Sequence, residues 1–132
     1  MAESEIARRI RAGTEHFNEG DFEAIRPTLA EEFEMHRRLG GLEDGDVVRG
    51  PDAFIAWLKP NVFSSMKAEI VDLHEAEGAI LVTVRSRAVG AASGVELEQD
   101  AFQVWEHDGE RATKVTMYQD REEAVRAAGL DG

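Results

Sequence analysis

The sequence contains no cysteine, and this absence excludes several classes of protein. Disulfide-stapled scaffolds, zinc sites built on thiolates and enzymes with a thiol nucleophile all require cysteine. Long apolar runs are absent too: the run from Ala79 to Val82 has the length of a strand, whereas a membrane span needs about 20 residues. The first 13 residues lack the apolar segment of a signal peptide. We therefore expect a cytoplasmic protein that does not enter a membrane.

The sequence also contains few positively charged residues compared with negatively charged ones. Fifteen Lys and Arg residues stand against 27 Asp and Glu residues, which gives a formal net charge of −12. The acidic residues are spread along the chain, so the overall field repels nucleic acids and anionic membranes, and we expect neither as a partner. A chain of 132 residues is long enough for one sizeable core, and we expect a single domain over residues 1–132.

The usual sequence signatures of metal and phosphate sites are missing. The four histidines show no paired spacing of the metal-ligand type. Gly40, Gly41 and Gly45 do not follow a strand and open a helix at phosphate-loop spacing, so we interpret them as a loop at a pocket rim. There is also no Gly-x-Ser-x-Gly nucleophile elbow. We expect no metal and no cofactor.

Three helices are predicted in the first half of the chain. The first begins near Ser4, with apolar residues and a glycine at helical spacing: Ile6, Ile10, Gly13 and Phe17. Gly20 can take the left-handed conformation that ends a helix, and Asp21 can cap the next one. Pro27 keeps this second helix short and bent. A third helix begins at Gly50-Pro51-Asp52 and breaks at Pro60.

The rest of the chain has the pattern of strands. Alternation over residues 33–38 predicts a first strand, and longer strands follow near 67–76, 79–89, 95–107 and 111–119. Asp108-Gly109 is typical of a type I′ hairpin turn. A short helix over 121–128 closes the chain. Helices followed by a meander predict an α+β fold: a strongly curved, mostly antiparallel, cone-shaped sheet wrapped around the three helices and enclosing a pocket.

Four segments resemble one family. "FNEGDFEAI", "RGPDAFIAWL", "SGVELEQDAFQVWEHDGERATKVTMY" and "DREEAVRAAGL" are similar to the SnoaL-like branch of the nuclear transport factor 2 superfamily. That superfamily includes ketosteroid isomerases, polyketide cyclases, scytalone and limonene-epoxide enzymes, and members that only bind or associate. The resemblance implies the cone fold, whereas a shared fold does not fix the function.

The resemblance also implies positions for catalytic groups. Gly13 stands where ketosteroid isomerases keep an oxyanion-binding tyrosine, and Arg37 stands where they keep the general-base aspartate. The third group, a pocket aspartate, matches Asp100 in "QDAF". We expect Asp100 as acid or base and Arg37 as a clamp for an anion or carbonyl. The alternatives are an Asp100 paired with Arg85 or Arg87, and an Arg37 paired with surface glutamates.

Strand parity then predicts which residues share a face. The resemblance places Asp100 and Phe102 inside the cone, and the neighbouring strand would add Val115, Met117 and Gln119. Seven residues are predicted to bind a ligand, although a closed core would use the apolar ones equally well: Phe17, Met35, Phe54, Trp57, Phe102, Met117 and Gln119. The outer face would then carry Leu97, Trp105 and Tyr118, which predicts a homodimer that covers them.

Three functions are compatible with the sequence. The first is a cofactor-free isomerase, cyclase, dehydratase or epoxide hydrolase acting on a small apolar substrate by acid–base chemistry. The second is a non-catalytic binder of a small apolar molecule. The third is a dimeric interaction module whose cone is closed by its own side chains. A cavity of several hundred Å³ would favour the first two over the third.

Overall fold

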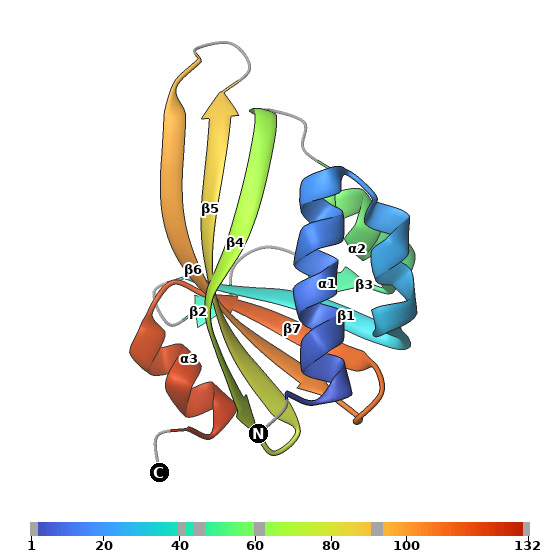
Figure 1. The fold of residues 1–132 in the computed structure, drawn as a ribbon. Helices are drawn as coiled ribbons and strands as arrows, with labels where there is room; N and C mark the ends of the chain where they lie inside the picture. The colour runs from blue at the N-terminus through green and yellow to red at the C-terminus, as the bar shows by residue number, and fades with distance from the viewer. Residues whose placement is uncertain (1–2, 40–41, 44–46, 60–62, 91–93, 131–132) are drawn as a thin grey trace.

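The computed structural model describes residues 3–39, 42–43, 47–59, 63–90 and 94–130. Figure 1 shows a curved sheet with helices on both faces. The glycines at 40, 41 and 45 and the predicted helix break at Pro60 lie outside the described residues.

The first helix, α1 (Glu5–Glu19), has the predicted ends. The Ser4 side chain caps its N-terminus by accepting a hydrogen bond from the backbone N–H of Ala7 at 3.2 Å. Gly20 ends the helix in the left-handed conformation with φ 77°, which a glycine adopts without a steric penalty. Ile6 and Ile10 on one face are buried, as the spacing predicted.

The corner after α1 leads into a 3₁₀ helix, η1 (Phe22–Thr28). The predicted cap by Asp21 is wrong, because the Asp21 side chain makes no capping hydrogen bond. Pro27 lies inside η1, and this helix is short as expected. The Phe17 and Phe22 rings meet edge to face at 5.8 Å across the corner, so α1 and η1 pack directly on each other.

The two later helices also begin and end close to the predicted residues. α2 (Pro51–Leu58) has proline in its first turn and buries Phe54 and Ile55. α3 (Arg121–Ala128) begins after Asp120, whose carboxylate accepts from the Glu122 N–H, and ends at Gly129 in the left-handed conformation.

Seven strands form one sheet in the order β2-β1-β7-β6-β5-β4, with β3 paired to β1. Their bounds are β1 (Leu29–Leu39), β2 (Leu42–Glu43), β3 (Val48–Arg49), β4 (Phe63–Ala76), β5 (Ala79–Gly90), β6 (Glu96–His107) and β7 (Ala112–Tyr118). The β1–β7 pair is parallel and the other pairs are antiparallel. The mostly antiparallel α+β fold is therefore confirmed, with β1 and β4 starting four residues earlier than the alternation predicted.

The Asp108-Gly109 hairpin exists, but its turn is not type I′. A type I′ turn needs positive φ at both central residues, and here only Gly109 has one, at 99°. The turn is longer: the Asp108 carboxylate accepts from the backbone N–H groups of Glu110 and Arg111 at 2.9 and 2.8 Å. These bonds lower the pKa of the Asp108 carboxyl, because they favour its charged form.

The helices divide the core into two clusters. α1, η1 and α2 cover the concave face of the sheet, where the larger cluster gathers around Phe33, Met35 and Val115. α3 covers part of the opposite, convex face over a smaller cluster that includes Leu81 and Val104. The far ends of β4, β5 and β6 project past the helices (Figure 1). The helices therefore cover only part of the concave face.

Candidate functional site

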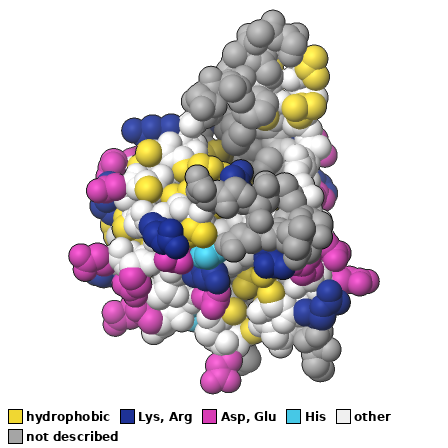
Figure 2. All heavy atoms as spheres, turned by 180° about the vertical axis from the view of Figure 1, so that it is seen from behind, with side chains coloured by type: hydrophobic (Ala, Val, Ile, Leu, Met, Phe, Trp, Pro, Cys, Tyr) yellow, Lys and Arg dark blue, Asp and Glu magenta, His cyan; other side chains and the backbone are white. Residues whose placement is uncertain are grey.

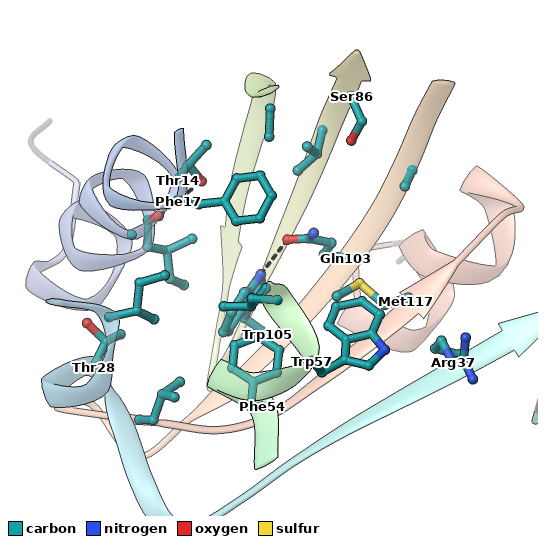
Figure 3. A pocket seen from close by; sticks show the side chains of 18 of the residues that line it. Thr14, Phe17, Thr28, Arg37, Phe54, Trp57, Ser86, Gln103, Trp105 and Met117 are labelled. Carbon is teal, nitrogen blue, oxygen red and sulfur yellow. Dashed lines mark hydrogen bonds between the residues drawn. The ribbon is translucent and has the colours of Figure 1, made fainter. Parts of the chain in front are cut away.

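A cavity of about 650 Å³ lies between the concave face and the three covering helices (Figure 3). Its volume falls within the range of about 300–1,000 Å³ that small-molecule sites occupy. Most of its wall is apolar. The lining residues are Arg9, Ile10, Gly13, Thr14, Phe17, Ile25, Thr28, Leu29, Arg37, Arg38, Phe54, Ala56, Trp57, Leu58, Lys59, Ala68, Val84, Ser86, Gln99, Ala101, Gln103, Trp105, Met117, Tyr118 and Gln119.

Strand register sets the sheet wall of the cavity. Met117 on β7 pairs with Arg37 on β1 and with Gln103 on β6, and directly paired residues project to the same face. Arg37, Met117 and Gln103 therefore form one row across three strands. Figure 3 shows Arg37 and Gln103 on opposite sides of Met117. This row therefore has an apolar side chain, Met117, in the middle and a polar side chain at each end.

One row deeper, the cavity is closed by an aromatic floor. Trp105 pairs with Val115, which in turn pairs with Met35, and only 9% of Trp105 is exposed. The Phe54 ring meets the Trp105 ring edge to face at 6.4 Å. The Trp57 ring lies nearly parallel to the Phe54 ring, at an interplanar angle of 14° and with the ring centroids 6.2 Å apart. A flat apolar molecule would find ring faces and edges on this floor.

A hydrogen bond orients the Gln103 amide. The Trp105 indole N–H donates to the Gln103 Oε1 at 2.9 Å (Figure 3). An indole N–H can only donate, so it holds the carbonyl oxygen of Gln103 towards itself. The Gln103 NH₂ group is then the part of the amide left to donate to a ligand.

Arg37 is the most unusual polar group in the cavity wall. Its Nε atom is buried and has no hydrogen-bond partner among the described residues. A buried donor without a partner costs about 1–3 kcal/mol, which a ligand oxygen would recover. The alternative considered from the sequence, a pairing of Arg37 with surface glutamates, is not observed in the described part of the chain.

The charges around the cavity have one sign. Four of the described lining residues are basic and none is acidic. Arg38 donates to the Glu123 carboxylate at 2.9 Å, and Arg9 donates to the Glu110 carbonyl oxygen at 2.8 Å. Both are therefore held by protein groups, in contrast to Arg37.

The expected inward orientation of Asp100 is wrong. Asp100 is exposed on the convex face, where Arg85 donates to its two carboxylate oxygens at 3.0 and 3.4 Å. Arg87 donates to Glu98 in the same way at 2.9 Å. The hydrogen bond with Asp100 raises the pKa of the Arg85 guanidinium. The observed pairing is the alternative considered from the sequence.

Two residues near Asp100 on the same strand, Phe102 and Trp105, were also assigned to the wrong face of the sheet. Phe102 and Tyr118 pack under α3 on the convex side, and burial raises the pKa of the Tyr118 hydroxyl. Trp105, expected on the outer face, is in the core. Leu97 is 54% exposed and shares its parity with Trp105. Leu97, Trp105 and Tyr118 therefore do not form one surface.

The structure gathers most of the other predicted residues at the cavity. Those that line it are Phe17, Arg37, Phe54, Trp57, Met117 and Gln119. Met35 is fully buried beneath the cavity and does not line it. The predicted alternation of faces along β6 failed to identify Gln99, Gln103 and Trp105 as lining residues. The sequence held a signal for them, because the carboxylates at 96, 98 and 100 alternate as on an exposed face.

The described residues contain no cluster of three or more His, Asp or Glu side chains placed to hold a metal ion. In the same part of the chain, no helix combines the length and the apolar character that crossing a bilayer requires.

Comparison with known proteins places this architecture in a family. The model of the SnoaL-like domain matches residues 10–115. No curated protein sequence matches the chain. A structure of an NTF2-like protein of unknown function from Burkholderia pseudomallei is similar, with a TM-score of 0.76, 22% identity, and coverage of 96% of this chain and 98% of that one.

Two further solved structures share the fold. One is a putative SnoaL-like polyketide cyclase from Jannaschia sp., with a TM-score of 0.71, 14% identity and coverage of 97% of this chain and 91% of that one. The other is an LEH-like epoxide hydrolase from M. tuberculosis, with a TM-score of 0.67, 16% identity and coverage of 93% of this chain and 88% of that one. The family match spans most of the sequence, so this chain belongs to the SnoaL-like domain family.

Proposed function

We propose that the protein binds a small, largely apolar molecule in the cavity between the sheet and its three covering helices. The observation that carries the proposal is the cavity itself, about 650 Å³ in volume with mostly apolar walls. Polar groups also reach it, and two of them on the sheet wall, Arg37 and Gln103, present donors at defined positions. This combination is typical of a small-molecule site.

The interaction-module alternative required a cone closed by its own side chains. The space above the aromatic floor of Phe54 and Trp105 argues against it, because the floor closes one end and leaves the volume beyond it open. Trp57 at the rim is 43% exposed, so part of the aromatic wall is accessible from solvent.

Turnover of the ligand is a second candidate, favoured by Arg37. A guanidinium with a buried, unpartnered Nε could stabilise negative charge that develops on a substrate oxygen. The family neighbours include a putative polyketide cyclase and an epoxide hydrolase. Asp100 cannot supply the proton transfer from the convex face, and the described lining residues contain no carboxylate. Binding is therefore the primary proposal.

Titration with N-phenyl-1-naphthylamine, a neutral apolar dye that fluoresces when it leaves water, tests the proposal. We expect saturable binding of one dye per chain by the wild type. Ala101→Phe would place a ring in the cavity and remove this binding, whereas Ala101→Ser at the same position would retain it. Thermal melts of the variants show whether each one is folded. Unchanged dye binding by folded Ala101→Phe, or no binding by the wild type, would contradict the proposal.

A further inference from the structure

We infer that the ligand is an organic monoanion: an apolar ring system that carries one carboxylate-type group, which Arg37 binds. This inference rests on the proposed function and names the class of molecule that the cavity selects. It starts from the contrast between a chain of net charge −12 and a cavity whose described charged lining residues are all basic.

Arg37 supplies the specific contact. Two of the other basic lining residues, Arg9 and Arg38, already donate to protein oxygens, and Lys59 lies exposed. Arg37 presents a buried Nε that the described residues leave without an acceptor. Hydrogen bonds between a guanidinium and a carboxylate are among the strongest in proteins. An anionic oxygen is therefore the acceptor that this site lacks.

Gln103 supplies a second donor on the same face. Trp105 holds the Gln103 carbonyl oxygen, which leaves the amide NH₂ for an acceptor. Met117 lies on the strand between those of Gln103 and Arg37, so the backbone positions of the two donor residues are about 10 Å apart across the sheet. A ring system resting on Met117 could present an oxygen to each. A cationic ligand would meet like charge at every described charged residue of the lining.

The distribution of acidic residues on β6 gives an independent reason. Two carboxylates of this strand, Glu98 and Asp100, lie on the convex face and are paired with Arg87 and Arg85. The concave positions between and beyond them are occupied by neutral Gln99, Ala101 and Gln103. The strand thus separates negative charge from the cavity, which lowers the electrostatic cost of placing an anion there.

A matched pair of dyes tests the inference. 8-Anilino-1-naphthalenesulfonate is N-phenyl-1-naphthylamine with one added sulfonate, and without a cation in the site the neutral, more apolar dye should bind more tightly. We expect the wild type to bind the sulfonate dye at least as tightly as the neutral dye. Arg37→Gln should weaken the sulfonate dye by about 10- to 100-fold and leave the neutral dye within about threefold. Arg37→Lys should retain part of the preference.

Arg87→Gln is the control for overall charge. It removes the same charge from an exposed position, 59% accessible, on the convex face, and should change neither dye. Wild type that binds the neutral dye clearly more tightly, or Arg37→Gln that weakens both dyes equally, overturns the inference and leaves the proposed function intact. Binding of neither dye would overturn the proposed function and the inference with it. The comparison of the two dye affinities in the wild type still tests the inference if Arg37→Gln does not fold.

Discussion

Two charged residues, Asp100 and Arg37, show that the face of the sheet on which a residue lies determines whether it can contact a ligand. Both were candidates for catalysis in the sequence. Arg37 lies on the concave face with a buried Nε that the described residues leave unpartnered, and Asp100 lies on the convex face with Arg85. A shift of one residue in a strand exchanges its two faces, so a correct strand with the wrong parity gives a wrong site.

The first prediction concerns Asp100. The side chains of Asp100 and Arg85 are 42% and 39% exposed, and ion pairs with this exposure contribute about 0–1 kcal/mol. Asp100→Asn should therefore lower the free energy of unfolding by less than about 1 kcal/mol in chemical denaturation. The affinities for both dyes should stay unchanged. A tenfold loss of dye binding would mean that Asp100 reaches the cavity after all.

The sequence predicted the positions of helices and strands better than it predicted which face of the sheet each strand residue occupies. Capping residues acted locally: Ser4 and Gly20 mark the ends of α1 as expected, and Asp120 and Gly129 bound α3, because each satisfies backbone groups within a few residues. Asp21 is the exception: it precedes a 3₁₀ helix, η1, and its side chain makes no capping hydrogen bond to that helix. Strand faces depend on distant partners. Both faces of β6 are partly covered, one by α1, η1 and α2 and the other by α3, so hydrophobicity alone could not choose between them.

The second prediction uses Gly13 within α1 and Gly20, which ends that helix. Gly20 has φ 77°, where an added Cβ is strained whatever the space, so Gly20→Ala should cost about 1–2 kcal/mol. Gly13 lies within the helix, and a Cβ there would meet only Ile25 Cγ1 at 4.0 Å. Gly13→Ala should therefore stabilise the protein by about 0.5–1 kcal/mol, because alanine is the better helix former.

Urea denaturation of the two variants measures these opposite effects. Since each change adds one methyl group, one inside α1 and one at its C-cap, opposite signs of the two effects isolate backbone conformation from the added apolar volume. Equal shifts in the same direction would contradict the assigned conformations.

At the scale of the whole molecule, the homodimer stays a prediction, but its surface must differ from the expected one. A charge introduced at Trp105 would not test it, because Trp105 lies in the core and the change would destabilise the fold. The exposed apolar residues nearest to the projecting strand ends are Val95 and Leu97, both 54% exposed. Seen from behind, Figure 2 shows apolar side chains at this projecting end, while acidic and basic side chains are scattered below it.

Sedimentation at micromolar concentration is the measurement for this third prediction. We expect a species of twice 14.6 kDa, and Leu97→Glu should shift it to the monomer, because a charge would have to be desolvated at the contact. Glu98→Gln, on the opposite face of the same strand, is the control and should leave the mass unchanged. A wild type that sediments only at 14.6 kDa would contradict the dimer.

The parallel pairing of β1 with β7 also has a consequence for the order in which the protein is made. β1 ends at Leu39, and its long partner begins only at Ala112. At about 5–20 residues per second, a ribosome needs roughly 4–15 s to synthesise the intervening chain. During that time the edge of β1 that later binds β7 is exposed to other nascent chains. Glu31 and Glu32 are exposed and lie in the stretch of β1 where its register with β7 shifts. Charged side chains on an unpaired edge discourage pairing with a foreign strand, until β7 arrives and completes the wall that holds Arg37.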